Sequence, residues 1–97
     1  MPTLLVLPGH TAFVFNATPP KGRVKFYVEA HAPIDVIITD ENGMRRHQQN
    51  LLPSAYAYSY GMTTWQHELY LPPGQVWCLL LLNRHPTEYR AVHWEAD

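Results

Sequence analysis

The chain has 97 residues, of which 46% are hydrophobic and 15% are charged, and its formal net charge is -1 at neutral pH. This composition excludes a disordered polyelectrolyte, and the lack of a basic surplus argues against nucleic acid as a partner. The length is that of one domain, so we expect residues 1–97 to form a single domain around one core.

Turn signals rich in glycine, proline, asparagine and aspartate recur along the chain, which is typical of short β-strands. In the first half we expect strands over residues 3–7, 11–16, 23–30 and 34–40. The third of these has the clearest alternation, because every second side chain is apolar, and one of its faces should therefore reach the core. The segment Asp40–Gly43 is predicted to form a tight turn.

The middle of the chain is less regular and rich in tyrosine. Tyr56, Tyr58 and Tyr60, which we call the tyrosine row, share one side of the chain if this segment is extended. Such a row can belong to an edge strand and cover a neighbouring part of the sheet. It can instead form a recognition surface, because tyrosine offers a large amphipathic contact area with few rotatable bonds. We predict a contact surface made of the tyrosine row and the nearby Arg45 and Arg46.

The most hydrophobic part of the chain is Trp65–Asn83, where we expect two short strands joined at Pro72–Gly74. Every side chain of Val76–Leu82 is apolar, and a half-exposed strand would alternate, so this strand should be central and covered on both faces. Cys78, the only cysteine, lies within it and is expected in the core rather than as a nucleophile. A last strand is expected over residues 88–95.

These elements predict an all-β fold of about seven to nine short strands with little or no helix. So many short strands cannot bury their apolar faces as one open sheet, and we therefore expect an antiparallel two-sheet β-sandwich that is jelly-roll-like. The apolar run near the N-terminus is too short for a membrane span or a secretory signal. With a lone cysteine and no internal disulfide, we expect a cytoplasmic protein with no membrane partner.

Two other kinds of site stay open at this point. Trp77, Trp94 and Tyr89 would form a sugar-binding platform if they shared an exposed face, although a buried tryptophan is the commoner arrangement. His67 and His93 could approach each other on neighbouring strands and bind a metal, which would make the chain a metal-dependent enzyme. The sequence contains no motif for nucleophilic catalysis, phosphate binding or thiol redox chemistry, so we expect no enzyme activity, no cofactor and no metal.

Three motifs carry a resemblance to known domains. Pro33–Asp40, the Pro-Pro-Gly corner within Glu68–Leu79 and the strand-ending Asn83 resemble the small β-sandwich accessory modules of the GOLD and bacterial pre-peptidase C-terminal type. The resemblance implies a compact jelly-roll-like sandwich that serves interaction or accessory binding and shares no catalytic residues. The chain departs from the pattern at Trp77–Cys78 and in its tyrosine-rich middle, and both departures leave the partner open.

We therefore predict a non-catalytic binding or protein-interaction module, with sugar binding as the alternative. The partner would be another protein or a second copy of this chain in a homodimer, because weakly charged strand edges invite pairing.

Overall fold

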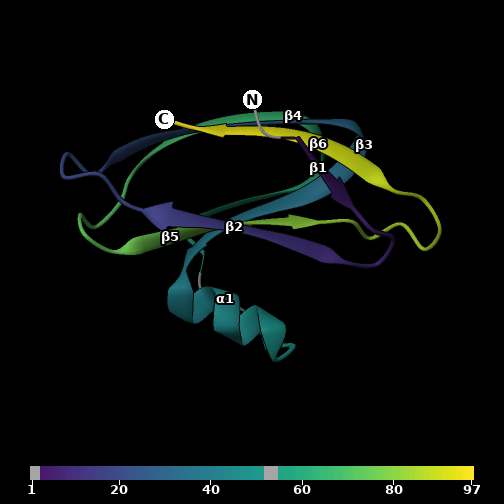
Figure 1. Ribbon diagram of the computed structural model, residues 1–97, viewed down its shortest axis with the longest axis horizontal. Coiled ribbons are helices and arrows are strands. Elements are labelled where there is room, and N and C mark those ends of the chain that lie inside the picture. Colours follow the sequence, from purple (N-terminus) through teal and green to yellow (C-terminus); the bar gives the residue numbers. More distant parts are fainter. Residues whose placement is uncertain (1–2, 52–54) are drawn as a thin grey trace.

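The computed structural model describes residues 3–51 and 55–97, and antiparallel β-strands make up most of it (Figure 1). No helix in this part of the chain is long and apolar enough to cross a membrane. The elements in chain order are β1 (Thr3–Val6), β2 (Thr11–Ala17), β3 (Arg23–Asp40), α1 (Glu41–Gln48), β4 (Ala57–Tyr70), β5 (Val76–Leu82) and β6 (Arg90–Ala96).

The six strands form one curled antiparallel sheet that is organised around β3. The strand order is β1-β6-β3-β5-β2, and β4 pairs with β3 outside this path. The first part of β3 pairs with β6 and the second part with β5, whereas β4 follows β3 along both parts. In Figure 1, β1 and β6 consequently lie above β2 and β5, and the bent β3 connects the two levels.

The number of strands is smaller than the sequence predicts, because a break expected between two strands is only a bend. Residues 23–30 and 34–40 belong to the single strand β3, which keeps its extended conformation through Pro33. The register against β4 shifts between Glu29 and Ile34 and again between Ile34 and Val36. A proline is tolerated at such an irregularity, since no ladder hydrogen bond is required of its nitrogen. The prediction of about seven to nine strands is therefore wrong, and the described residues contain six.

The segment expected as a turn after β3 is the start of the helix α1. The side chain of Asp40 accepts a hydrogen bond from the Gly43 backbone nitrogen at 2.7 Å and caps the helix. Arg45 donates to Glu41 one turn earlier, with 2.8 Å between the two side chains. An aspartate that bonds the backbone ahead is common to tight turns and helix N-termini, so the local signal was ambiguous.

The core fills the inside of the curl, and a second apolar cluster lies on the outside of β5. The inner cluster includes Phe26, Trp77 and Leu79, all of which are almost completely buried. The outer cluster is built from Ile37, Cys78, Leu80 and Leu82, with Met44 of α1 packed against it. The strand β5 lies between β3 and β2 and is thus covered by the core on one face and by α1 on the other. The predictions of a central, doubly covered strand and of a buried Cys78 are confirmed.

Candidate functional site

A groove of about 660 Å³ lies on the outside of the curled sheet, between the end of α1 and the first half of β4. Its floor is Ile37 of β3 and Leu82 of β5, both almost fully buried. Tyr58 and Tyr60 line one side. Tyr58 pairs with Ile37 across the β3–β4 ladder, so the two side chains lie on the same face of the sheet.

The two tyrosines of this groove present their rings to solvent. The side chains of Tyr58 and Tyr60 are 64% and 58% exposed, and their ring centroids are 5.4 Å apart. Two large exposed aromatic residues beside an apolar floor form a concave surface that can bury a ligand's apolar groups.

The cation of Arg84 also lines this groove. The carboxylate of Asp35, which is only 7% exposed, contacts the Nε atom of Arg84 through one oxygen. The other oxygen accepts a hydrogen bond from the Gly61 backbone nitrogen at 2.9 Å. The Arg84 guanidinium lies 6.0 Å from the centre of the Tyr60 ring. These contacts place the planar head of Arg84, whose side chain is 69% exposed, beside Tyr60.

His47 lines the groove from the α1 side. Its Nε2 atom lies 3.1 Å from the hydroxyl of Thr11, and its ring packs edge-on against Phe13 at 5.9 Å. Burial, and then the positive charge of Arg84, lower the pKa of His47 from its ordinary value. The imidazole is therefore neutral at pH 7.

The predicted contact surface is divided in the structure. Tyr58 and Tyr60 line the groove, whereas Tyr56 is exposed beside it, and its backbone nitrogen donates to Ile38. Arg45 and Arg46 lie on α1 and are not among the groove residues. Arg45 instead forms an ion pair with Glu41.

Sequence reasoning missed the two polar groups that accompany the tyrosines, Arg84 and His47. The only available signal was Asp35, an acidic residue inside an apolar strand, which called for a cationic partner. Nothing in the linear sequence identified that partner as Arg84, 49 positions later.

The three residues of the expected sugar platform do not share a surface. Trp77 is 4% exposed and packs edge-on against Phe26, with 5.1 Å between the ring centroids. Trp94 is half-buried against the core, opposite Val28, and Tyr89 is exposed in the loop before β6. Trp77 therefore has the commoner, buried arrangement, and the exposed face that the sugar-binding alternative requires of it is absent.

His67 and His93 are not on neighbouring strands, as the metal-binding alternative would require. His67 of β4 pairs with Phe26, and His93 of β6 pairs with Glu29, so β3 runs between them. Positions 26 and 29 of a strand face opposite sides, and the two histidines therefore lie on opposite faces of the sheet. Within residues 3–51 and 55–97, no three His, Cys, Asp or Glu side chains are grouped so that they could hold a metal ion.

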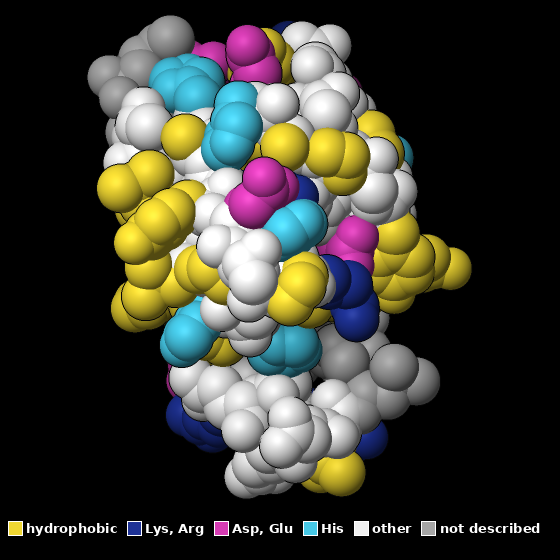
Figure 2. All heavy atoms as spheres, turned by 90° about the vertical axis from the view of Figure 1, so that its right-hand side faces the viewer, with side chains coloured by type: hydrophobic (Ala, Val, Ile, Leu, Met, Phe, Trp, Pro, Cys, Tyr) yellow, Lys and Arg dark blue, Asp and Glu magenta, His cyan; other side chains and the backbone are white. Residues whose placement is uncertain are grey.

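Two other histidines, His31 and His85, accept hydrogen bonds from backbone nitrogens at one end of the molecule. Figure 2 looks at this end, where histidine and hydrophobic side chains intermingle. The Nδ1 atom of His31 accepts a hydrogen bond from the Ala91 backbone nitrogen at 3.0 Å, and that of His85 accepts one from Glu88 at 3.0 Å. The His31 contact thus joins β3 to β6, and the His85 contact lies within the loop between β5 and β6.

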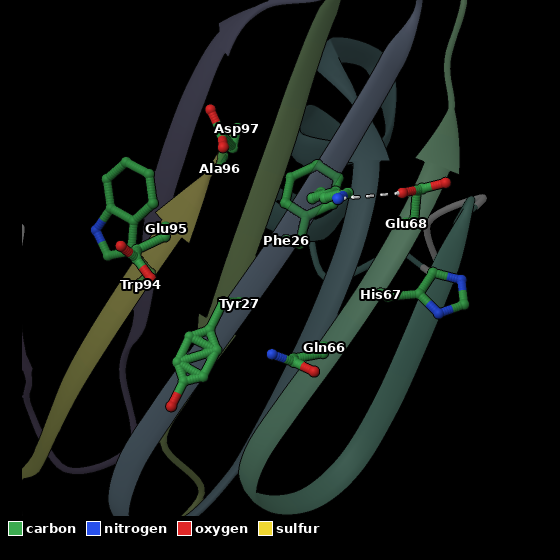
Figure 3. A pocket seen from close by; sticks show the side chains of 10 residues that line it. Phe26, Tyr27, Gln66, His67, Glu68, Trp94, Glu95, Ala96 and Asp97 are labelled. Carbon is green, nitrogen blue, oxygen red and sulfur yellow. Dashed lines mark ion pairs between the residues drawn. The ribbon is translucent and has the colours of Figure 1, made fainter.

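A second, larger hollow of about 1050 Å³ lies over β3, β4 and β6 (Figure 3). Its charged lining residues are the ion pair Lys25–Glu68 and the acidic residues Glu95 and Asp97. Glu68 lies 2.9 Å from Arg23 and 4.0 Å from Lys25, and the latter pair is drawn as a dashed line in Figure 3. All three side chains are well exposed, so water satisfies them as readily as a ligand would. We therefore regard the groove beside the tyrosines as the candidate site.

No family model matches the sequence, and no curated protein matches it. The resemblance to the GOLD and pre-peptidase modules stays a prediction, and the function has to be argued from the groove itself.

Proposed function

We propose that this chain is a non-catalytic binding module that holds a partner protein in the groove between α1 and β4. The observation that carries the proposal is the combination of two exposed tyrosines, Tyr58 and Tyr60, with an apolar floor and the cation of Arg84. Tyrosine and arginine are the residue types that contribute most to protein interfaces, particularly where they border a pocket.

The chemistry of the groove supports binding rather than catalysis. The described lining contains no carboxylate, thiol or amine, and its polar groups are His47, Asn50, Arg84 and the two tyrosines. The nearest thiol, Cys78, is fully buried under α1, and burial raises its pKa to about 11. Such a set can orient and desolvate a ligand, but it offers no activated nucleophile beside a base.

A selection from displayed random peptides tests the proposal. Peptides that the wild-type protein selects should lose at least about tenfold in affinity when Tyr58 or Tyr60 is changed to Ser, as expected for aromatic residues central to an interface. The matched control is Tyr70→Ser, which changes a still more exposed tyrosine on the same strand outside the groove. All three variants should keep nearly the wild-type thermal stability, because their rings face solvent.

Two results would contradict the proposal. Peptides that bind equally well to the Tyr58→Ser and Tyr70→Ser variants would place the binding surface elsewhere. A selection that enriches no peptide would argue against a peptide-binding groove.

Self-association is a second proposal, and the open edge of β4 favours it. Among the described strands β4 pairs only with β3, so its other edge carries unpaired backbone groups over Ala57–Tyr70. This strand holds one carboxylate, Glu68, and no lysine, arginine or proline, which are the residues that usually protect an edge. A second copy that pairs along this edge would form a two-fold dimer.

Two further points remain proposals. The curled sheet is consistent with a two-layer, jelly-roll-like sandwich, and we propose that the molecule belongs to this architecture. We also infer a cytoplasmic location, because the only thiol, Cys78, is free and buried and the fold uses no disulfide.

A further inference from the structure

The terminal nitrogens of Arg84 point to the chemistry of the ligand. Its Nε atom contacts the buried carboxylate of Asp35, and its plane lies near the Tyr60 ring. In the part of the chain that the structure describes, Nη1 and Nη2 have no protein partner, and the side chain is 69% exposed. An arginine that is anchored through Nε offers two parallel donors, which match the two oxygens of a carboxylate.

The surroundings favour a single negative charge. Asp35 contacts Arg84 through Nε, and its second oxygen accepts a hydrogen bond from the Gly61 nitrogen. His47 is neutral at pH 7 and adds no second cation. Arg84 is the only arginine or lysine among the described residues that line the groove, so one monoanionic carboxylate matches the groove better than a dianionic phosphate does.

The rest of the groove fits an apolar group attached to that carboxylate. Ile37 and Leu82 form the floor, and Tyr58 forms a side. The tyrosines are more than half exposed, so the groove is open along β4 instead of closed around a small molecule. An open groove lined by apolar side chains and one guanidinium suits the end of an extended chain.

We propose that the groove binds the C-terminal carboxylate of a partner protein whose last side chain is aromatic or aliphatic. The carboxylate is held by Nη1 and Nη2 of Arg84, and the last side chain packs between Tyr58 and Leu82. This inference rests on the proposed function of the groove and names the part of the partner that it recognises.

The test compares two peptides that differ only at the C-terminus: acetyl-Ala-Leu-Phe with a free carboxylate and the same peptide as its amide. Both are titrated into the full-length, isotopically labelled protein and followed by NMR. The free acid should shift the Arg84 Nε–H signal and the backbone signals of Tyr60 and Leu82. It should bind about tenfold or more tightly than the amide, since a charge-assisted hydrogen bond is lost with the amide.

Variants of Arg84 assign the effect to its guanidinium. Arg84→Gln together with Asp35→Asn removes both charges, avoids a buried unpaired carboxylate and should erase the difference between acid and amide. Arg84→Lys keeps the positive charge but lacks the two parallel donors, so it should retain only part of the difference in affinity between the acid and the amide. The control is Arg45→Gln on α1, outside the groove, which should bind both peptides as the wild type does.

The outcomes separate this inference from the broader proposal. If acid and amide bind with equal affinity and Tyr58→Ser weakens both, the proposal that the groove recognises a carboxylate is wrong, whereas the proposal of a binding module stands. If the free acid binds the Tyr58 and Arg84 variants as tightly as the wild type, both the proposed carboxylate recognition and the proposed binding groove are wrong. If 3-phenylpropionate binds as tightly as the peptide acid, the ligand is a small carboxylic acid and the inference of a protein C-terminus is wrong.

Discussion

The side-chain amide of Asn83 donates a hydrogen bond to the carbonyl of Val6, 77 positions earlier in the chain, at 3.0 Å. The same nitrogen donates to the Glu88 carbonyl at 2.7 Å, and the side-chain oxygen accepts from the His85 nitrogen at 3.0 Å. Asn83 directly follows β5 and is 2% exposed. One buried side chain thus joins the edge strand β1 to the loop that leads from β5 to β6.

Replacing this side chain should destabilise the fold strongly. Asn83→Ala leaves the Val6 and Glu88 carbonyls without their donor, and we expect the free energy of unfolding to fall by about 2–4 kcal/mol. Urea denaturation measures the loss. The control Asn42→Ala alters an exposed asparagine on α1 and should change the free energy by less than about 0.5 kcal/mol. A similar effect from both substitutions would show that the Asn83 hydrogen bonds contribute little.

The Asp40 cap should determine how well α1 protects Cys78. Asp40→Ala removes the hydrogen bond to Gly43 and should cost about 0.5–2 kcal/mol, so that α1 opens more often. Cys78 is fully buried beneath this helix, and its reaction with an aromatic disulfide reagent under native conditions should become faster.

The matched control for this experiment is Asp40→Asn, which removes the same charge but keeps a good capping side chain. It should react with the reagent at close to the wild-type rate. If Asp40→Asn and Asp40→Ala accelerate the reaction equally, the lost negative charge near the thiol is responsible and the capping argument fails.

His47 should make the fold less stable in mild acid. Because its pKa is lowered in the folded state, the unfolded chain binds a proton more readily between the folded value and the ordinary value of 6.5. The contribution of His47 to the free energy of unfolding is therefore complete above about pH 6.5 and is lost as the pH falls below that value.

Urea denaturation of the wild type and of His47→Gln at pH 7.5 and 5.5 isolates this contribution. The other histidines are common to both proteins, so the wild type should lose more stability than the variant on acidification. An equal loss in both proteins, or a larger loss in the variant, would contradict the assigned direction of the pKa shift.

The open edge of β4 should control self-association. Light scattering over a range of concentrations should show the wild-type mass rising from 11.2 kDa towards a dimer. Gln66→Lys with Tyr70→Lys adds positive charge to two exposed positions of β4 and should keep the protein monomeric. Thr87→Lys, in the β5–β6 loop, should not alter the equilibrium. A wild-type mass that stays at the monomer value, or a dimer that the β4 substitutions leave intact, would exclude this interface.

Local patterns predicted the strands well where the periodicity was complete. The alternation over residues 23–30 and the unbroken apolar run of Val76–Leu82 each correspond to strand structure, and the latter is the doubly covered centre. Pro33 predicted an irregularity correctly, but whether it ends a strand or bends it depends on the pairing with β4, which lies elsewhere in the sequence.

The candidate site was only partly predictable for a similar reason. The tyrosine row is a local feature, and period-two spacing was sufficient to place Tyr58 and Tyr60 on one side. The contact of Asp35 with Arg84 and the approach of His47 arise only when β3, β5 and α1 come together. No short window of sequence contains that information.

The central position of β3 also has a consequence for the order in which the protein can fold during synthesis. β3 is paired with β4, β5 and β6, and all three strands are made after it. Until β6 leaves the ribosome, the apolar side chains around Phe26 lack the strand that completes their layer. Such non-local pairing is slow and leaves the apolar face of β3 exposed for a time, so we expect folding to wait for β6 and to benefit from a chaperone that covers β3.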